Sequence, residues 1–255
     1  MPAPKNMFKS RLLAGDTLIG CWMDFAEACT TEVMGTAGFD WLVIDGEHGP
    51  NDVRSIRDQL MVLEGNASHP VVRVPIGETW IIKQALDAGA QTVLVPMVES
   101  ADQARELVRA CTYPPTGTRG VGGAGARATR FSGISDYVTT ADAQICLLVQ
   151  VENRAGLAEL DAILAVDGVH GVFIGPADLA ADLGYPGNSG APEVEAAIKD
   201  AIERIAAAGK APGILGLNDT VIQNYLDWGA RFVAVGIDVL MLANTARATA
   251  KRWMS

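Results

Sequence analysis

The sequence predicts an α/β protein with the (β/α)8, or TIM-barrel, fold. Short apolar runs rich in β-branched residues alternate with longer amphipathic segments, and eight such pairs can be counted. This alternation is typical of parallel strands that are buried on both faces and covered by helices. A chain of 255 residues also has the usual length of one such barrel. A doubly wound sheet is the alternative, but eight buried strands favour closure, so we expect a single domain over residues 1–255.

The expected strands are short runs dominated by Val, Ile, Leu and Phe. They cover Leu18–Trp22, Trp41–Ile44, Val71–Val74, Thr92–Val95, Ile145–Val151, Gly171–Ile174, Gly213–Leu215 and Phe232–Val235. The expected helices follow them in turn, at Ala28–Thr36, Asp52–Leu63, Thr79–Asp87, Ala101–Cys111, Ala155–Ala165, Glu193–Ala208, Asp219–Trp228 and Val239–Trp253. Glycine pairs that precede strands, where a helix must stop, mark the turns Gly38-Phe39, Gly89-Ala90 and Gly229-Ala230.

Charge and composition exclude several classes of protein. A formal net charge of −10 argues against nonspecific binding of nucleic acid, which needs a basic surface. The first residues contain no apolar signal core, and no run approaches the roughly 20 apolar residues that span a bilayer, so we expect a cytoplasmic protein. The four cysteines, Cys21, Cys29, Cys111 and Cys146, lack the spacing of a zinc site and are expected to be buried free thiols.

One irregular connection, from Tyr113 to about Ser135, is too long to be a simple turn. It is rich in glycine and carries Arg119, Arg127 and Arg130. Its backbone N–H groups and arginines could bind an anion, or it could be a flexible lid with solvated arginines. It is not a Walker-type phosphate loop, because no Gly-Lys-Ser/Thr sequence follows.

Polar residues close the fifth and sixth expected strands. Gln150 and Glu152 are two positions apart and therefore point to the same side of the fifth strand. Asp178, in Gly-Pro-Ala-Asp after the sixth strand, offers a second carboxylate at the same edge. Two oxygen donors could share a hard divalent cation, although both acids could instead cap the helices that follow.

The second and third strands supply the other candidates. His48 follows a strand and has Asp45 and Glu47 beside it, so it is either a general base or a hydrogen-bonded loop histidine. His69 and His170 stand just before strands, at the opposite end, and are expected to be structural or solvated. Arg73 lies within an apolar strand, where an unpaired guanidinium would be very costly.

Arg73 must therefore face either a carboxylate, in a structural ion pair, or a ligand. We favour the ligand, because arginine suits a carboxylate or a developing oxyanion.

Five motifs in order resemble the HpcH/HpaI class II, metal-dependent pyruvate aldolases, most closely the 4-hydroxy-2-oxoheptanedioate aldolases. They are Trp-Leu-Val-Ile-Asp-Gly-Glu-His-Gly-Pro at 41–50, Val-Pro-Met-Val at 95–98, Gly-Thr-Arg-Gly-Val at 117–121, Val-Gln-Val-Glu at 149–152 and Gly-Val-Phe-Ile-Gly-Pro-Ala-Asp at 171–178. The resemblance runs from about Asn6 to Trp253 and is specific to the superfamily, not to one substrate.

The resemblance implies a set of roles. Glu152 and Asp178 would bind Mg2+, Mn2+ or Co2+, and a 2-oxo acid such as pyruvate would chelate that metal. Arg73 would stabilise the enolate oxygen, His48 would accept the proton, and Asp45 would orient His48. Gln150, Asp178 and the backbone around Ala177 would hold substrate, and Asp87 would support the histidine across a subunit contact. Members of the family also swap a C-terminal helix between subunits and form hexamers of paired barrels. An ordinary eighth barrel helix is the alternative for Asp238–Trp253.

Departures from the expected pattern concern the substrate. The loop reads Val-Gly-Gly-Ala-Gly-Ala at 121–126, and the seventh strand ends Gly-Ile-Leu-Gly-Leu at 213–217. A smaller hydroxyaldehyde acceptor or a hydroxypyruvate donor is therefore as plausible as a dicarboxylic substrate. No lysine falls at a strand end, which argues against a Schiff-base aldolase. The alternatives are a citramalyl- or malyl-thioester lyase of the same superfamily and a non-catalytic metabolite-binding barrel.

Overall fold

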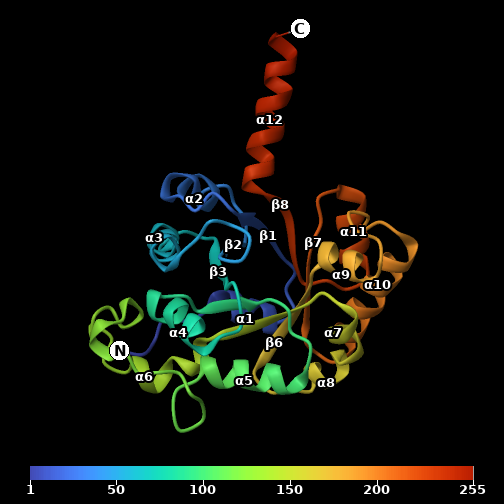
Figure 1. Cartoon of the computed structure of the whole chain (residues 1–255). Helices are drawn as coiled ribbons and strands as arrows, with labels where there is room; N and C mark the ends of the chain where they lie inside the picture. Colours follow the sequence, from blue (N-terminus) through green and yellow to red (C-terminus); the bar gives the residue numbers. More distant parts are fainter. Residues whose placement is uncertain (255) are drawn as a thin grey trace.

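Eight parallel strands form a closed barrel in which each strand pairs with the next and the last pairs with the first (Figure 1). The structure is a computed structural model, and it describes residues 1–254. The predicted TIM barrel is confirmed, and the doubly wound alternative is wrong. The strands are β1 (Leu18–Met23), β2 (Trp41–Asp45), β3 (His69–Arg73), β4 (Thr92–Val95), β5 (Cys146–Val151), β6 (Val169–Ile174), β7 (Ala211–Leu215) and β8 (Phe232–Ile237).

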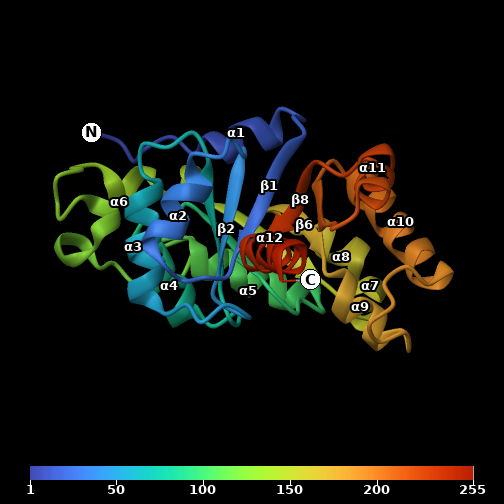
Figure 2. The ribbon, with the colours of Figure 1, turned by 90° about the horizontal axis from the view of Figure 1, so that it is seen from above.

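Helices follow the strands as expected, with one broken in two. The predicted helix at Ala155–Ala165 is a pair of short helices, α7 (Arg154–Ala158) and α8 (Leu160–Leu164), which meet at Glu159. The other expected helices are α2 (Ala28–Gly35), α3 (Val53–Leu63), α4 (Thr79–Ala88), α5 (Ala101–Cys111), α10 (Pro192–Ala207), α11 (Asp219–Asp227) and α12 (Asp238–Trp253). Figure 2 shows α2 to α5, α10 and α11 arranged around the strands, whereas α12 is seen end-on.

Three further helices were not expected. They are α1 (Met7–Leu13), α6 (Tyr137–Thr140) and α9 (Pro176–Asp182). None of the helices in residues 1–254 is both long enough and apolar enough to cross a membrane. The predicted turn before β4 is confirmed, because Gly89 ends α4 in the left-handed conformation with φ of 116°.

Side chains point alternately into and out of the barrel along each strand, which gives an inner apolar layer and an outer one beneath the helices. On β2, Trp41 and Val43 point into the barrel, whereas Leu42 and Ile44 point outward to the helices. The inner layer is rich in rings: Trp41 lies 5.8 Å from Phe232 and 6.3 Å from Trp22, measured between ring centroids. The interior is therefore a packed core, as is usual for this fold.

Helix α1 closes the end of the barrel where the strands begin. Its Phe8 is buried and lies 6.0 Å from Trp41 and 6.2 Å from Phe232. Asn6 caps the helix by accepting a hydrogen bond from the backbone of Lys9, and its amide donates to the carbonyl of Gln144. These bonds tie the N-terminal segment across the barrel floor, so the inner cavity can open only at the other end.

The last helix does not cover the barrel wall. Figure 1 shows α12 extending away from the strands toward the C-terminus, and most of its side chains are exposed. The exposed residues include Leu240, Met241, Leu242 and Trp253. In this single chain α12 is therefore not an ordinary eighth barrel helix.

The ring packing predicts the effect of a substitution at Gly213. A Cβ atom there would lie 2.1 Å from the Phe232 ring, so a methyl group cannot fit without moving the ring. We expect Gly213→Ala to lower the free energy of unfolding by about 1–3 kcal/mol, the usual cost of overpacking a core. Urea unfolding followed by tryptophan fluorescence measures this. Gly125→Ala is the matched control, because no atom lies within 4 Å of its Cβ position, and an equal effect of the two substitutions would contradict the explanation.

Candidate active site

A cavity of about 200 Å3 lies where the strands end. Residues at or just after the ends of β1, β2, β3, β5, β6, β7 and β8 line it, together with the first turn of α9. They are Trp22, Asp24, Asp45, His48, Arg73, Gln150, Phe173, Gly175, Pro176, Ala177, Asp178, Leu215 and Ile237. No lysine is among them, in agreement with the expectation from the sequence. A larger hollow of about 360 Å3 lies at the opposite end around His69 and Gln91, away from the strand ends where barrel enzymes place their chemistry.

The polar side chains of the cavity continue the inward-pointing positions of their strands. Asp45 follows Trp41 and Val43 in steps of two, and Asp24 follows Trp22 in the same way. The same alternation brings Arg73 and Gln150 inward. The sequence analysis missed Asp24, although the rule that identified Gln150 and Glu152 would have found it.

Arg73 and Asp45 form a buried, two-pronged ion pair. The Nε atom of Arg73 lies 2.8 Å from Oδ1 of Asp45, and Nη2 lies 2.5 Å from Oδ2. A third contact joins Nη1 to Oε2 of Glu47 at 2.7 Å, and the guanidinium lies 5.2 Å from the centre of the Trp22 ring. Arg73 thus forms the structural ion pair that was the alternative prediction, and it also lines the cavity.

Burial and pairing act in opposite directions on these groups. Burial by itself would raise the pKa of Asp45, but hydrogen bonds and charge from Arg73, with the backbone N–H groups of Glu47 and His48, hold that pKa below its usual range. Burial raises the pKa of Glu47 despite the nearby arginine. At neutral pH the pair of Arg73 and Asp45 is therefore fully charged.

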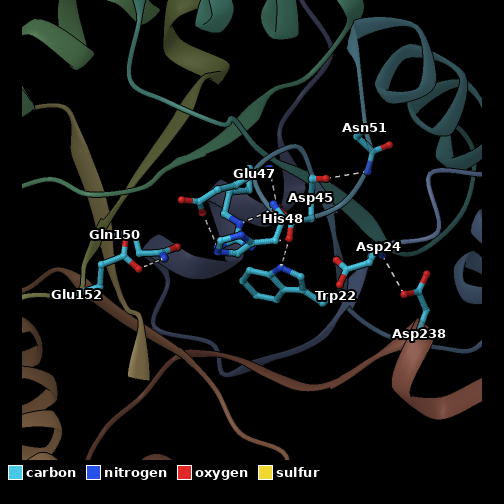
Figure 3. A network of polar contacts seen from close by, with 10 residues as sticks. Trp22, Asp24, Asp45, Glu47, His48, Asn51, Gln150, Glu152 and Asp238 are labelled. Carbon is cyan, nitrogen blue, oxygen red and sulfur yellow. Dashed lines mark hydrogen bonds and ion pairs between the residues drawn. The ribbon is translucent and has the colours of Figure 1, made fainter. Parts of the chain in front are cut away.

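Asp45 holds the turn that carries His48 without touching the imidazole. Its Oδ1 accepts from the backbone N–H groups of Glu47 at 2.9 Å and His48 at 3.4 Å, and its Oδ2 accepts from the indole of Trp22 at 3.2 Å. Figure 3 shows this network, with the His48 ring beside it. In the part of the chain that is described, neither Asp45 nor Glu47 bonds to the exposed ring, so Asp45 positions His48 through its backbone.

Glu152 is almost completely buried at the end of β5. Gln150 donates a hydrogen bond to one of its oxygens, and the backbone N–H of Met97 donates to the other at 2.8 Å. Burial raises the pKa of Glu152, these two bonds lower it, and the charge of Asp178 raises it again. Asp178 is exposed in the first turn of α9. Neither acid is the residue that caps its neighbouring helix, since Asn153 and Gly175 occupy those positions.

The donors at this edge fit a hard divalent cation. Glu152 and Asp178 offer carboxylate oxygens close enough to repel one another, and Oε1 of Gln150 is buried with no partner among residues 1–254. In the same described range no three His, Cys, Asp or Glu side chains form a complete ligand set. Two carboxylates with room for a chelating substrate is a usual arrangement for Mg2+, which keeps several ligand positions for water or substrate.

Asp24 completes the cavity on the β1 side. Its backbone N–H donates to Oδ1 of Asp238 at 2.9 Å, and Asp238 also accepts from the N–H of Val239 at 2.7 Å. Burial, together with the charges of Asp45 and Asp238, raises the pKa of Asp24 to about 6. Asp238 was likewise missed from the sequence, where it reads only as the start of a helix.

Asp87 and the glycine-rich loop lie outside this cavity. Asp87 pairs with Arg119 at 3.1 Å, and Arg119 is completely buried against the ring of Tyr113. Arg127 and Arg130 both pair with Glu64. In the single chain each loop arginine is thus paired with one of the protein's own acids. Arg130 is nevertheless 60% exposed, and Nε and Nη1 of Arg119 have no hydrogen-bond partner within residues 1–254.

The remaining histidines and the cysteines are structural. His69 and His170 lie within strands, not before them as predicted. The ring of His69 contacts the Thr92 hydroxyl at 3.0 Å, and burial lowers its pKa to about 4. His170 accepts a hydrogen bond from the backbone of Leu147. All four cysteines are free thiols as predicted, but Cys29 is exposed and not buried.

Comparisons with known proteins agree with this geometry. The family of HpcH/HpaI aldolases and citrate lyases matches residues 18–245. A hydroxypyruvate/pyruvate aldolase of Roseovarius nubinhibens is 64% identical over 99% of this chain and 98% of its own, and a 4-hydroxy-2-oxo-heptane-1,7-dioate aldolase of Salmonella dublin is 52% identical over 98% and 95%. The crystal structure of an HpcH/HpaI aldolase/citrate lyase family protein from Burkholderia cenocepacia superimposes with a TM-score of 0.95, at 39% identity, over 98% of this chain and 100% of that one.

The buried ion pair predicts that Asp45→Ala is strongly destabilising, because it leaves the Arg73 guanidinium buried and partly unpaired. We expect the free energy of unfolding to fall by about 3–5 kcal/mol, measured by urea unfolding at neutral pH. Removing the exposed partner of Arg11 with Asp16→Ala is the control and should cost no more than about 1 kcal/mol. Comparable losses in the two variants would contradict the assignment.

The same pair predicts a dependence on pH. The folded-state pKa of Asp45 lies below its ordinary value of 3.8. The stabilisation is therefore complete above that value and is lost as the pH falls through the folded-state pKa. We expect the difference between the wild type and Asp45→Ala to shrink in buffer more acidic than this. It should also fall as the pH rises through 6, because Asp24, whose pKa Asp45 helps to raise to about 6, then ionises and repels Asp45 in the wild type alone.

Proposed function

The chain belongs to the HpcH/HpaI aldolase/citrate lyase family and is an aldolase, a carbon–carbon lyase, and from that premise we propose its substrates and the roles of its residues. The reaction we propose is the making and cleaving of 4-hydroxy-2-oxo acids, with hydroxypyruvate or pyruvate as the donor and an aldehyde as the acceptor. The observation that carries the proposal is one cavity at the strand ends that is lined by His48, Arg73, Gln150 and Asp178. Glu152 lies at its edge, where Gln150 donates a hydrogen bond to it.

The names of the relatives favour hydroxypyruvate or pyruvate as donor. Relatives at 64% and 60% identity are called hydroxypyruvate/pyruvate aldolases, whereas the heptanedioate aldolases stand at 52%. The end of the seventh strand, whose Leu215 lines the cavity, departs from the pattern expected for the heptanedioate enzymes, as does the loop at 121–126 outside it. A small aldehyde, such as a hydroxyaldehyde or a semialdehyde, suits a cavity of about 200 Å3.

Glu152 and Asp178 would hold a divalent cation, Mg2+, Mn2+ or Co2+, which as a Lewis acid would polarise the ketone of the 2-oxo acid. The buried Glu152 is fixed by the bonds from Gln150 and Met97, so its carboxylate is oriented before any ligand arrives. The unpartnered Oε1 of Gln150 would accept a hydrogen bond from the substrate or its water. The backbone around Ala177 closes the same side of the cavity.

Arg73 would stabilise negative charge on the substrate, and His48 would accept a proton from it. Transfer of a C3 proton from the 2-oxo acid to His48 would leave an enolate, and the guanidinium of Arg73, held in place by Asp45, would offset the charge on the enolate oxygen. In the cleavage direction His48 takes the hydroxyl proton of the aldol, the C3–C4 bond breaks, and the aldehyde leaves. Because the His48 ring is free of protein partners in the described chain, its unprotonated nitrogen is available to accept this proton.

The proposal predicts that a chelator abolishes activity. Enzyme dialysed against EDTA should lose at least about 100-fold in the rate of pyruvate release from a 4-hydroxy-2-oxo acid, because metal polarisation is worth several kcal/mol. Added Mg2+, Mn2+ or Co2+ should restore the rate. Glu152→Gln should weaken Mn2+ binding, measured by titration against the electron paramagnetic resonance signal of free Mn2+.

Glu106→Gln is the control for the metal experiment, since Glu106 is exposed on the outer helix α5 and pairs only with Arg109. This variant should bind Mn2+ like the wild type. Full activity after chelation, or unchanged Mn2+ binding by Glu152→Gln, would refute the metal assignment.

We also propose that the enzyme is a homo-oligomer, a hexamer built as a trimer of dimers. The extended α12, with Leu240, Met241 and Leu242 exposed, supports a helix that packs on another copy. The proposed role of Asp87, supporting His48 across a subunit contact, depends on this assembly, because Asp87 lies outside the cavity of its own chain.

The assembly proposal predicts a solution mass of six times 26.8 kDa by light scattering. Leu242→Glu should lower that mass, because it places a charge on the apolar part of α12. Arg247→Glu, a charge change on the exposed part of the same helix, is the control and should keep it. A wild-type mass of one chain would refute the proposal.

A further inference from the structure

We propose that Asp24 recognises a hydroxyl group of the substrate and thereby selects hydroxylated over unhydroxylated substrates. The inference rests on the proposed aldol reaction and adds the feature of the substrate that the cavity distinguishes. Neither the motifs of the sequence nor the comparisons with known proteins assign a role to Asp24.

Asp24 is held rigidly at the edge of the cavity. It follows Leu18, Gly20 and Trp22 on the inward-pointing positions of β1 and lines the cavity with His48 and Arg73. The carboxylate of Asp238, which is 5% exposed, accepts from the backbone N–H groups of Asp24 at 2.9 Å and Phe25 at 3.4 Å. These bonds fix the start of the loop after β1 and therefore fix where the Asp24 side chain can reach.

The Oδ1 atom of Asp24 is enclosed and has no hydrogen-bond partner within the described chain. The carboxyls of Asp45 and Asp238 lie nearest, and Asp45 can share a hydrogen bond with Asp24 only while one of the two is protonated, so the ionised Asp24 receives no donor from them. The only cation of the cavity, Arg73, is already bound to Asp45 and Glu47. An enclosed acceptor without a donor is costly, so a donor supplied by a ligand would stabilise it.

The raised pKa of Asp24 agrees with this geometry. A carboxylate that already had a donor or a cationic partner would normally have a lowered pKa. Here burial and the charges of Asp45 and Asp238 outweigh the more distant Arg73 and raise the pKa to about 6. At neutral pH the group is mainly ionised and still lacks a donor.

Only one part of the proposed substrates suits this position. A substrate carboxylate would be repelled by Asp24, Asp45 and Asp238, and a ketone oxygen is an acceptor that cannot donate. A hydroxyl group is neutral and donates. In Figure 3 Asp24 lies on the far side of Trp22 from Gln150 and Glu152, which are the residues proposed to receive the carboxylate and ketone end.

Two substrate hydroxyl groups could reach Asp24: the C3 hydroxyl of hydroxypyruvate and the C2 hydroxyl of a hydroxyaldehyde acceptor. Pyruvate lacks the first, and acetaldehyde lacks the second. A hydrogen bond to a charged acceptor in a closed site discriminates strongly against the analogue that cannot form it. Each hydroxyl can therefore be tested against an analogue that differs by that group alone.

The experiment compares Asp24→Ala with the wild type in two arms. In the donor arm, kcat/KM for hydroxypyruvate is divided by that for pyruvate, each with acetaldehyde. In the acceptor arm, kcat/KM for glycolaldehyde is divided by that for acetaldehyde, each with pyruvate. We expect Asp24→Ala to lower one of these ratios by about tenfold to a hundredfold, and the arm that changes identifies the hydroxyl group.

Ratios that stay within about threefold of the wild type in both arms would overturn the inference, since this is below the contribution of one charged hydrogen bond. An equal loss for every substrate would overturn it too, because it would show a general role in folding or proton transfer. Asp58→Ala, an exposed acid on α3 that pairs with Arg57, is the matched control and should leave both ratios unchanged.

A second variant covers the case in which Asp24→Ala does not fold. Asp24→Asn keeps the volume and one acceptor oxygen but removes the charge, so it should lower the same ratio by about fivefold. An unchanged ratio would overturn the inference.

Exchange of the C3 protons of pyruvate in D2O by the metal-loaded wild type, followed by NMR, tests the proposed function separately. Exchange by the wild type with unchanged ratios in the variants rejects the role of Asp24 alone. A wild type that neither exchanges these protons nor forms any aldol product rejects the aldol proposal itself.

Discussion

The buried ion pair between Arg73 and Asp45 is the interaction on which the rest of the site depends. Two charges on neighbouring strands are enclosed together, and each would be very unfavourable alone in this environment. The remaining polar atoms of Asp45 are satisfied by Trp22 and by the backbone of the turn that carries His48. The Asp45 carboxylate thus holds three groups in place: the Arg73 guanidinium, the Trp22 indole and the backbone of the turn that carries His48.

Acidic side chains far outnumber basic ones at the edge of the cavity. Asp24, Asp45, Glu47, Glu152 and Asp178 stand around one guanidinium, and burial raises the pKa of three of these acids. Such an excess of negative charge costs stability in the empty protein, and it would be offset by a bound cation and by substrate donors. The acids that do not pair with Arg73 are therefore the ones that a bound cation or substrate donor would stabilise.

Much of this arrangement could be predicted from the sequence, because strand periodicity alone decides which side chains enter a barrel. That rule identified Gln150 and Glu152, and with the position of Arg73 in an apolar run it located the site. The rule was not applied to Asp24, because the expected strand ended at Trp22 and Asp24 lies two residues further along the chain. The sequence could not show whether Asp45 bonds to Arg73 or to the His48 ring. Either partner would satisfy the carboxylate, and only the directions of the side chains in the folded protein decide between them.

Other features depend on parts of the molecule that are remote in sequence. The burial of Phe8 depends on an open barrel end that exists only after eight strands have closed, so α1 left no clear signal in the pattern. The position of α12 is not set by packing on the wall of its own barrel, so the pattern of its sequence did not distinguish it from an ordinary barrel helix. The pairing of Arg127 and Arg130 with Glu64 joins a loop to a helix end more than 60 residues away, and local patterns carry no information at that range.

The ring-filled floor of the barrel has a consequence for the order of events. Phe8, Trp41 and Phe232 close one end completely, so every molecule that reacts must enter and leave through the same opening. On the proposed assignment the 2-oxo acid is held beside Glu152, and the aldehyde lies between it and the opening. A site with a single entrance would then favour an ordered kinetic sequence, in which the 2-oxo acid binds first and leaves last and therefore competes with the incoming aldol.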